Sequence, residues 1–281
     1  MGAALRTDLA VPDGEFDFTW VDFRTIAKLV HGEAGIVLPE SKAALVYSRL
    51  SKRLRELRLS SFSDYCGLID DSADERQVLI AAMTTNVTRF FRESHHFEHL
   101  RHSVYPVLID KARQGVRIRL WSAACSSGEE PYSIALSLLH AMPDATDHDI
   151  LILASDLDPN MIAIGQAGIY PASRLEDIPP HFRKGAIEGT GDRFRFTERV
   201  RRLVRFRHLN LLREWPIHGS FHVIFCRNVM IYFDQPTQDA IWPRFANVMV
   251  PGGHLYIGHS ERLVTDGFSL VSQTAYRRSG L

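Results

Sequence analysis

The sequence predicts a small all-helical domain followed by an α/β domain with a mostly parallel sheet and helices on both faces. Between residues 16 and 90, apolar side chains recur at helical spacing. From about Pro106, apolar strand-like segments alternate with helical ones, which is typical of parallel sheets. The clearest such unit runs from Arg117 to Ser137, where a strand, a loop of small residues and an apolar helix follow one another.

Residues 1–15 are polar and contain glycine and proline, so we expect a frayed tail. In the helical domain, Val46, Leu50, Leu54 and Leu57 form an apolar stripe and predict an amphipathic helix. Two more helices are expected around residues 62–69 and 78–83. Five basic residues should turn away from the apolar stripe, and we call them the basic face: Arg49, Lys52, Arg53, Arg55 and Arg58.

Residues 91–105 are expected to link the helical domain to an α/β domain at 106–281. A segment at about 171–200 fits neither pattern, and the alternating Arg193-Phe194-Arg195-Phe196 indicates a small inserted β subdomain. A disordered loop there would leave its phenylalanines unburied. The expected parallel strands are Ile118–Ser122, Ile150–Ser155, Leu203–Arg207, Phe221–Cys226 and His254–Gly258, with a closing antiparallel pair at Phe268–Val271 and Thr274–Arg277.

The loop after the first strand has the features of a nucleotide site. Ser127 and Glu130 have the spacing of a capping box, and the helix start offers free N–H groups to a ligand. Asp156 ends the second strand, where an acidic side chain can bind ribose hydroxyls. Among the glycines of a GxGxxG pattern only Gly128 is present, so an ordinary strand-to-helix connection is the alternative.

Composition narrows the classes of partner. The 281 residues contain 33 basic and 33 acidic side chains, so no global charge favours nucleic acid or an anionic membrane. Three scattered cysteines do not form a disulfide framework or a zinc cluster, and no metal site is expected. No long apolar segment stands near residue 1 and no run of about 18 apolar residues occurs, so we expect neither a signal peptide nor a membrane span. We therefore expect a cytoplasmic protein.

Four strings in one order carry a family resemblance. They are Thr84–Glu93 (TTNVTRFFRE), Ser126–Ser133 (SSGEEPYS), Cys226–Phe233 (CRNVMIYF) and Gly258–Glu261 (GHSE). From about Phe16 to Arg277, the chain resembles the CheR-type chemotaxis protein-glutamate O-methyltransferases. This resemblance implies a class I methyltransferase fold and the cofactor S-adenosylmethionine, with S-adenosylhomocysteine as product.

The resemblance also implies the cofactor-binding residues. Carboxylates, amides and arginines suit a positively charged sulfonium with a zwitterionic tail. Glu129 alone could instead favour the helix dipole, and Asn86 alone could be a helix cap. The positions that match the family's cofactor contacts are Asn86, Thr88, Arg92, Glu129, Asp156, Asn210, Leu211, Arg227 and Asn228.

The implied reaction is attack of a glutamate carboxylate on the sulfonium methyl group. This carboxylate has a pKa of about 4.3 and is ionised at neutral pH, so no general base is required. Catalysis then depends on positioning, and Arg92 and Tyr232 are the candidates for orienting the substrate. For Tyr232 the alternative is a place in the apolar core.

The implied substrates are glutamates on the helical cytoplasmic bundles of bacterial chemoreceptors. The basic face suits such acidic surfaces, although a merely solvated helix face is the alternative. The turn at residues 188–194 looks shorter than in relatives that bind a receptor's C-terminal peptide, so we expect no such tether, and we expect a monomer. The chain lacks the strings of adenine and pyrimidine methylases. A non-catalytic adaptor that binds the cofactor is the rival interpretation.

Overall fold

The computed structural model describes residues 11–189 and 191–280. The chain divides into a helical unit, Met1–Thr85 with Tyr232–Asp234, and an α/β unit, Asn86–Ile231 with Gln235–Leu281. The first ten residues of the expected tail, and Thr190 in the turn of the inserted subdomain, lie outside the described part. The cysteines Cys66, Cys125 and Cys226 are all buried and free.

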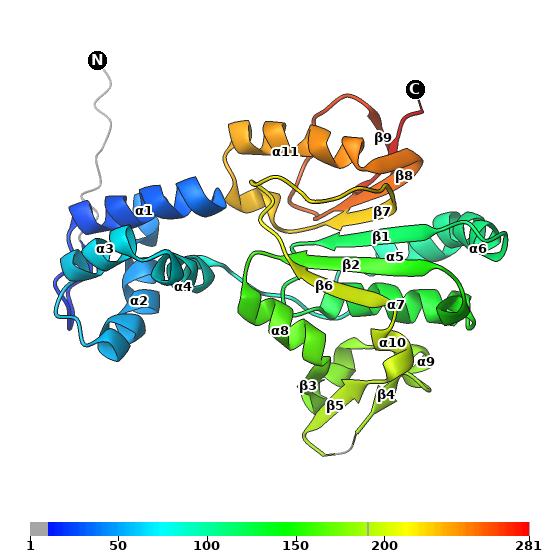
Figure 1. Cartoon of the computed structure of the whole chain (residues 1–281), viewed down its shortest axis with the longest axis horizontal. Coiled ribbons are helices and arrows are strands. Elements are labelled where there is room, and N and C mark those ends of the chain that lie inside the picture. The colour runs from blue at the N-terminus through cyan, green and yellow to red at the C-terminus, as the bar shows by residue number, and fades with distance from the viewer. Residues whose placement is uncertain (1–10, 190, 281) are drawn as a thin grey trace. The chain divides into compact units, whose positions relative to one another are not determined.

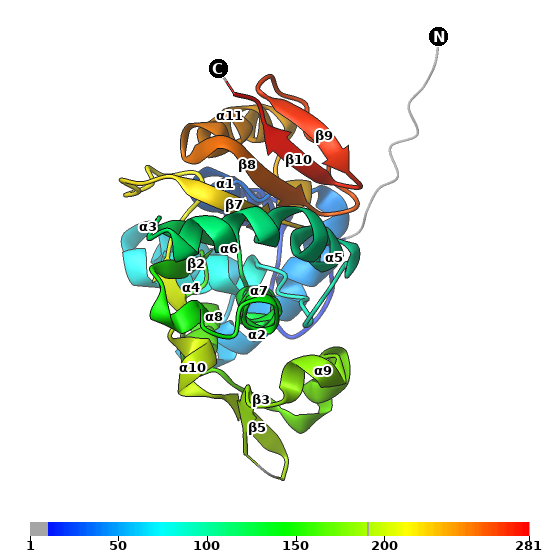
Figure 2. The ribbon, with the colours of Figure 1, turned by 90° about the vertical axis from the view of Figure 1, so that its right-hand side faces the viewer.

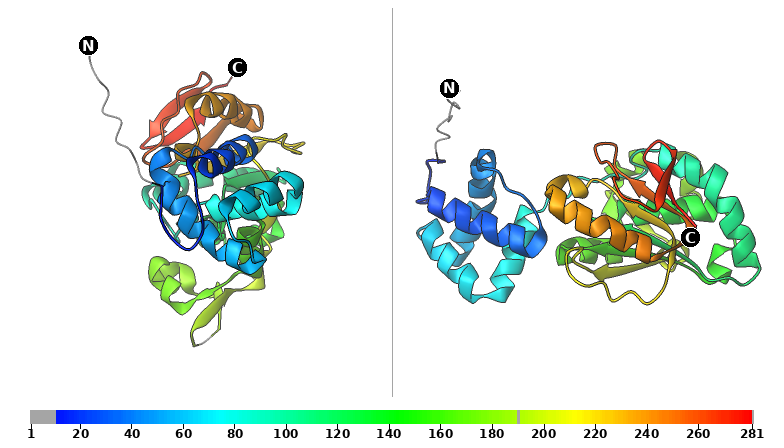
Figure 3. Two further views of the ribbon diagram at one scale, coloured as in Figure 1. Left: turned by 90° about the vertical axis from the view of Figure 1, so that its left-hand side faces the viewer. Right: turned by 90° about the horizontal axis from the view of Figure 1, so that it is seen from above.

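In its described residues, the helical unit contains four α-helices, α1 (Trp20–Ala34), α2 (Ala43–Leu57), α3 (Phe62–Asp71) and α4 (Ala73–Met83), and a short 3-10 helix at Glu40–Lys42 (Figure 3). A capping box between Thr19 and Asp22 starts α1, and Gly35 ends it in a left-handed conformation. The predicted apolar stripe is confirmed, because Val46 and Leu50 are fully buried. Leu54 is equally buried, whereas Leu57 at the end of α2 is only half-buried.

The basic face differs from its prediction at Arg49 and Arg53. Arg49 donates hydrogen bonds to backbone carbonyls at the end of α4, including those of Met83 and Thr84, both at 2.9 Å. Arg53 forms an ion pair of 2.6 Å with the buried Glu75 of α4. These two arginines therefore join α2 to α4, because the end of a helix offers unpaired carbonyls and a buried carboxylate requires a cation.

Only part of the basic face is free to meet a partner. Lys52, Arg55 and Arg58 are exposed. Lys52 and Arg55 each lie near one exposed carboxylate, that of Glu56 and that of Glu15. Surface pairs of this kind contribute little to stability and are readily exchanged for other partners.

The α/β unit is built around a seven-stranded sheet in the order β6-β2-β1-β7-β8-β10-β9 (Figure 1). Strands β6, β2, β1, β7 and β8 are parallel, and β10 pairs antiparallel with β8 and β9, which confirms the predicted closing pair. The strands are β1 (Ile118–Ala123), β2 (Ile150–Asp156), β6 (Val204–His208), β7 (Phe221–Cys226), β8 (Met249–Ile257), β9 (Phe268–Ser272) and β10 (Ala275–Arg278).

Apolar side chains fill both faces of the sheet. On one face, Trp121 of β1 contacts Phe245 of α11 (Gln235–Asn247), with ring centroids 5.3 Å apart. On the other, Phe225 of β7 stacks on Phe97, with centroids 5.9 Å apart. The remaining long helices are α6 (Tyr105–Arg113), α7 (Glu129–Ala141) and α8 (Pro159–Ala167). This arrangement confirms helices on both faces, which a sheet of buried parallel strands requires.

The segment expected to be a linker, residues 91–105, is instead part of the α/β core. It forms α5 (His95–His99) and a π-helical turn (Leu100–Val104) that runs into α6. Leu100 is fully buried in the same apolar cluster as Phe97. The apolar residues here are separated by several histidines, a spacing that conceals the buried side of the helix in the sequence.

The inserted subdomain contains a second, three-stranded sheet in the order β3-β5-β4. Figure 2 shows β3 and β5 set apart from the seven-stranded sheet. The alternation that predicted a strand is confirmed, because Phe194 and Phe196 are buried while Arg193 and Arg195 are exposed. The elements are β3 (Ile169–Pro171), α9 (Pro180–Arg183), β4 (Ile187–Glu188), β5 (Arg193–Phe196) and α10 (Glu198–Arg201).

Candidate functional site

The loop between β1 and α7 lies at the carboxyl end of the sheet, where open α/β sheets bind ligands. Cys125 donates a backbone hydrogen bond of 2.9 Å to the carbonyl of Ser155 at the end of β2. Gly128 has a φ of 99°, and a Cβ there would lie 3.0 Å from the ring of Phe206. Only glycine therefore fits this turn, both for its left-handed backbone and for the packing beneath it.

The predicted capping box is wrong. α7 begins at Glu129, and its N-cap residue is Gly128, which has no side chain to accept a hydrogen bond. Ser127 instead donates to the carboxylate of Glu129 at 2.6 Å. Glu130, the expected partner of Ser127, accepts a hydrogen bond of 2.6 Å from Ser122 at the end of β1. The two acidic side chains thus face the strand ends and the loop.

Glu129 is a buried carboxylate at the predicted cofactor loop. Only 3% of the residue is exposed. Burial raises its pKa, and the hydrogen bond from Ser127 opposes that rise. A positively charged ligand group would restore the ionised form, because a nearby opposite charge lowers the pKa of a carboxyl. The surroundings of Glu129 therefore suit an ammonium or sulfonium ligand.

Asp156 clamps the same loop from the end of β2. One carboxylate oxygen accepts from the backbone N–H of Ser126 at 2.7 Å, and the other accepts from the N–H of Asp158 at 2.9 Å. Burial raises the pKa of Asp156, against these hydrogen bonds. Each carboxylate oxygen has a further lone pair for a ligand hydroxyl.

The first family string comes close to this loop. The carbonyl of Asn86 accepts a hydrogen bond of 3.3 Å from the hydroxyl of Ser126. The amide of Asn86 donates to the carboxylate of Asp158 at 3.3 Å. The carbonyl of Thr88 accepts a long bond, 3.4 Å, from Arg174. The structure therefore brings Asn86 and Asp156 to one loop, although they are 70 positions apart in the sequence.

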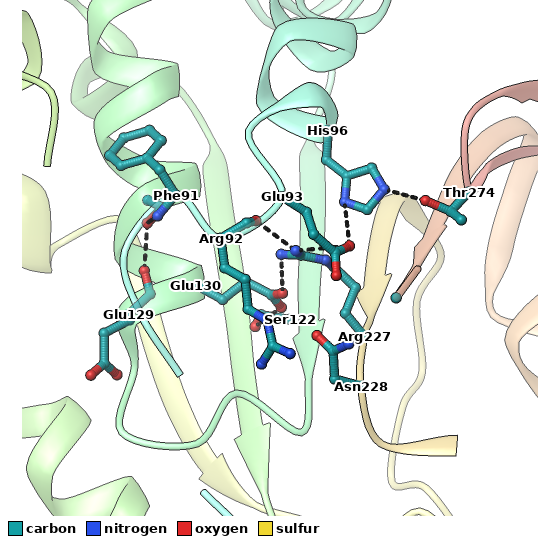
Figure 4. A network of polar contacts seen from close by, with 12 residues as sticks. Phe91, Arg92, Glu93, His96, Ser122, Glu129, Glu130, Arg227, Asn228 and Thr274 are labelled. Atoms are coloured by element: carbon teal, nitrogen blue, oxygen red, sulfur yellow. Dashed lines mark hydrogen bonds and ion pairs between the residues drawn. The ribbon is translucent and has the colours of Figure 1, made fainter. Parts of the chain in front are cut away.

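Arg227 organises the segment that carries Arg92 (Figure 4). Its guanidinium lies 2.9 Å from Glu130 and 3.2 Å from Glu93, and it donates to the carbonyl of Arg92. Burial would raise the pKa of Glu93, but Arg227 and a hydrogen bond from His259 outweigh it and lower this pKa to about 2. The side chain of Arg227 is thus committed to protein groups, a role that the sequence did not predict.

Arg92 itself is half-buried and donates a hydrogen bond of 2.9 Å to the carbonyl of Val87. The neighbouring Phe91 has a φ of 51°, and its backbone N–H donates to the hydroxyl of Ser133 on α7. The segment is therefore fastened to α7 on one side and to Arg227 on the other. A guanidinium held on such a segment is in place to bind an anionic group.

Glu261 fixes the turn that follows β7. Its carboxylate accepts hydrogen bonds from the backbone N–H groups of Asn228, Val229 and Met230, at 2.8 to 2.9 Å, and from that of Gly258. The turn is left-handed at Asn228, where φ is 59°. The fourth family string thus supplies the group that shapes the third. Glu261 is not among the site residues predicted from the sequence.

The remaining predicted site residues lie after β6 and β7. Leu209 donates a backbone bond of 3.0 Å to the carbonyl of Asp156, which places the following Asn210 and Leu211 beside the end of β2. The side-chain oxygen of Asn210 accepts from the N–H of Leu212 at 2.9 Å. Tyr232 belongs to the helical unit, where its carbonyl accepts from the N–H of Val37.

Glu93, His95 and His96 place three potential metal-binding atoms within 4.8 Å of one another. These are side chains that bind zinc in other proteins. Here the guanidinium of Arg227 already supplies the positive charge at Glu93. We therefore interpret the cluster as part of the Arg227 network.

Each of the two units matches a family model of its own. The model "CheR methyltransferase, SAM binding domain" matches residues 86–277, and "CheR methyltransferase, all-alpha domain" matches residues 21–84. A "Probable chemotaxis protein methyltransferase" of Rhizobium etli is 52% identical over 258 residues, covering 89% of this chain and 96% of that protein. "Chemotaxis protein methyltransferase 2" of Pseudomonas aeruginosa is 44% identical, covering 93% and 94%. The "Chemotaxis protein methyltransferase" of Escherichia coli is 40% identical, covering 92% and 90%.

Proposed function

Because this chain belongs to the CheR methyltransferase family and its cofactor is S-adenosylmethionine, we propose that it methylates glutamate side chains of bacterial chemoreceptors. The products would be glutamate methyl esters that serve sensory adaptation in the cytoplasm. The observation that carries this proposal is the similarity to chemotaxis methyltransferases over about nine-tenths of the chain.

The residues at the carboxyl end of the sheet fit such a cofactor. The left-handed Gly128 packs on Phe206 and lets α7 begin at Glu129, so that the N–H groups of its first turn lie at the carboxyl end of the sheet. The buried Glu129 suits the ammonium group of the methionine tail, and Asp156 suits the ribose hydroxyls. We propose that the cofactor is held by these two carboxylates and by Asn86, Thr88, Arg92, Asn210, Leu211, Arg227 and Asn228.

Within that set, Arg227 has a distinct contribution. Its guanidinium is already bound by Glu93, Glu130 and the carbonyl of Arg92. Arg227 would therefore act mainly by holding the Arg92 segment in place, and its backbone and the adjoining Asn228 would face the cofactor.

The bound cofactor supplies an activated methyl group to a carboxylate oxygen of the substrate. The chain's own task is to orient that carboxylate and to exclude water, because a glutamate is already ionised at neutral pH. We assign the orientation to Arg92, by charge-assisted hydrogen bonding, and to Tyr232, by its phenol. Neither residue has to transfer a proton.

The assignment of Tyr232 can be tested by Tyr232→Phe, which removes only the hydroxyl. Turnover on receptor substrate should fall by about tenfold or more, since misplaced substrates lose much of the benefit of positioning. The affinity for S-adenosylhomocysteine, measured by calorimetry, should remain unchanged. A variant that methylates receptors at the parental rate would mean that Tyr232 only packs against its neighbours.

The product itself distinguishes a glutamate methyltransferase from other methyltransferases. Receptor-rich membranes are incubated with the protein and with methyl-labelled cofactor, and the labelled protein is then treated with mild alkali. Methyl esters release labelled methanol, whereas N-methyl products do not. Alkali-stable label would contradict the proposed substrate, and absence of any label, with cofactor binding intact, would favour a non-catalytic adaptor.

Recognition of the receptor would run through the exposed part of the basic face. Lys52, Arg55 and Arg58 offer positive charge to an acidic helical bundle, while Arg49 and Arg53 maintain the helical unit. We propose that the short turn at residues 188–194 binds no C-terminal receptor peptide, so that recognition does not depend on a tether.

A further inference from the structure

Four arginines line one cavity at the edge of the seven-stranded sheet. The cavity has a volume of about 270 Å³. Arg201 and Arg202 reach it from the end of α10, and Arg205 and Arg207 reach it from β6, the edge strand. Figure 1 shows α10 and β6 as consecutive elements on this side of the sheet. None of these residues belongs to the cofactor site described above.

The charge of this cavity is poorly balanced. Its one acidic lining residue, Glu198, pairs with Arg201 at 2.7 Å. Across the described part of the chain, Arg202, Arg205 and Arg207 form no ion pair with a carboxylate. Arg205 and Arg207 donate instead to backbone carbonyls of their own strand. Like charges that line one cavity repel one another, and an anion bound between them would relieve this repulsion.

Protection of an edge strand is the simpler explanation for part of this pattern. Charged side chains on an edge prevent pairing with another chain, and this accounts for Arg205 and Arg207. It does not account for Arg201 and Arg202, which lie outside the strand and converge on the same cavity. The fold also leaves the Nε atom of Arg201 buried and without a hydrogen-bond partner, which costs stability.

We propose that this cavity binds a small ligand carrying a phosphate or diphosphate group. Guanidinium groups bind phosphate oxygens through paired hydrogen bonds, and four of them converge here. The volume is close to the lower end of small-molecule sites, which suits a compact anion rather than a protein surface. A second cavity of about 200 Å³ shares Arg202 and Arg205 and offers room for the rest of the ligand.

Two aromatic side chains lie between this cavity and the loop that carries Gly128. Tyr132 and Phe206 line the cavity, and the ring of Phe206 also packs under Gly128. A ligand in the cavity therefore would not compete directly with the cofactor. Binding can be measured on protein saturated with S-adenosylhomocysteine, so that any anion effect at the cofactor site is excluded.

The test is a calorimetric titration with inorganic pyrophosphate at constant ionic strength, using the full chain saturated with S-adenosylhomocysteine. Saturable binding with a dissociation constant below about 1 mM is expected. The exposed pair Arg202→Ala and Arg205→Ala should weaken it by about tenfold or more, the scale of charge-assisted hydrogen bonds. The matched control is Arg262→Ala, an exposed arginine of the same unit that does not line the cavity.

Four outcomes would overturn the proposal. Pyrophosphate could show no saturable binding while receptor binding is also indifferent to these arginines, which would leave edge protection as their role. Its binding could survive in the double variant, or weaken equally in Arg262→Ala, which would place the anion elsewhere. An acidic receptor fragment could require Arg202 and Arg205 while pyrophosphate does not bind, which would make this edge a protein docking surface.

Discussion

Two loops at the carboxyl end of the sheet are each held by one carboxylate, which accepts hydrogen bonds from several backbone N–H groups. Glu261 is the clearest case, because four backbone N–H groups point at its two oxygens. We expect Glu261→Gln to lower the stability of the α/β unit by about 1–3 kcal/mol, since an amide nitrogen cannot accept these bonds. The affinity for S-adenosylhomocysteine should fall as well, because Asn228 lies in the same turn.

Urea unfolding and calorimetry measure these two effects of Glu261→Gln. The control is Ser260→Ala, which alters the exposed neighbouring side chain and should leave both quantities unchanged. Parental stability and affinity in Glu261→Gln would show that the turn keeps its shape without this carboxylate.

His96 makes the stability of the α/β unit depend on pH. It is fully buried, and burial together with the positive charge of Arg227 lowers its pKa from 6.5 to about 3. Between pH 6.5 and 3, His96 is protonated in the unfolded chain but stays neutral in the folded chain. The free energy of unfolding therefore falls as the pH falls below 6.5. The contribution of His96 is up to about 2 kcal/mol between pH 6.5 and 5. The pKa of Glu93 is lowered from 4.5 to about 2, so protonation of this carboxylate reduces the free energy of unfolding only below pH 4.5.

Urea midpoints measured from pH 7 to 5 test this dependence. His96→Gln keeps a side chain that can meet Thr274, whose hydroxyl lies 2.7 Å from His96 Nε2, and it should flatten the decline. His218→Gln, at an exposed site, should follow the parental curve. Burial also lowers the pKa of His99, His222 and His254, so some slope should remain. An unchanged slope in His96→Gln would contradict the assignment.

Side chains at strand ends could be predicted from the sequence, whereas their partners could not. Asp156 and Asn228 follow apolar strands, and parallel strands end at one edge of the sheet, so their placement follows from local pattern. The Arg227 network joins Glu93, Glu130 and Arg227, which come from three separate segments. No local spacing records such contacts, and the capping pattern at Glu130 assigned that residue to the wrong partner.

At the scale of elements, α2 and α4 are joined by a partly buried ion pair. The pKa of Glu75 is lowered by its hydrogen bond from Arg53, against the effect of burial. Removing Arg53 would leave this carboxylate with Tyr65 as its hydrogen-bond donor, at 3.1 Å. We expect Arg53→Ala to destabilise the helical unit by on the order of 2 kcal/mol, less than for a fully buried pair because Arg53 is 29% exposed.

The matched control for Arg53→Ala is Lys52→Ala, one position away and 81% exposed, which should cost less than about 0.5 kcal/mol. Adding Glu75→Gln to Arg53→Ala should recover part of the loss, since the unpaired charge is then removed. Thermal unfolding of the full chain measures all three variants. Equal effects at Arg53 and Lys52 would mean that the pair contributes nothing beyond surface charge.

The bounds of a strand could be predicted where its residues are continuously apolar, but not where turn-forming residues interrupt the apolar pattern. β7 was predicted with the bounds that it has, because all six of its residues are buried and five of them, all but His222, are apolar. β8 begins at Met249 and includes Pro251-Gly252-Gly253, whereas the strand predicted from the sequence begins only at His254. The tertiary pairing of Phe221 with Met249 extends the strand across those turn-forming residues, an effect that local propensity does not contain.

At the scale of the whole molecule, the proposed docking on an acidic receptor predicts a dependence on salt. The attraction involves exposed charges, so it weakens as the Debye length shrinks from about 10 Å at 0.1 M to 3 Å at 1 M salt. Only exposed basic residues can be replaced to test docking, because replacing Arg53 would also break its ion pair with Glu75 and destabilise the helical unit. Lys52→Glu with Arg55→Glu should therefore raise the Michaelis constant for receptor and reduce its dependence on salt.

The affinity for S-adenosylhomocysteine should not change in this double variant, because the proposed cofactor residues belong to the α/β unit. Lys28→Glu, which reverses another exposed charge of the helical unit, is the control and should alter the Michaelis constant little. Deleting the receptor's C-terminal tail should also have little effect, given the short turn at residues 188–194. If tail deletion abolishes methylation while Lys52→Glu with Arg55→Glu behaves like the parent, recognition runs through the inserted subdomain and the basic face is only solvated.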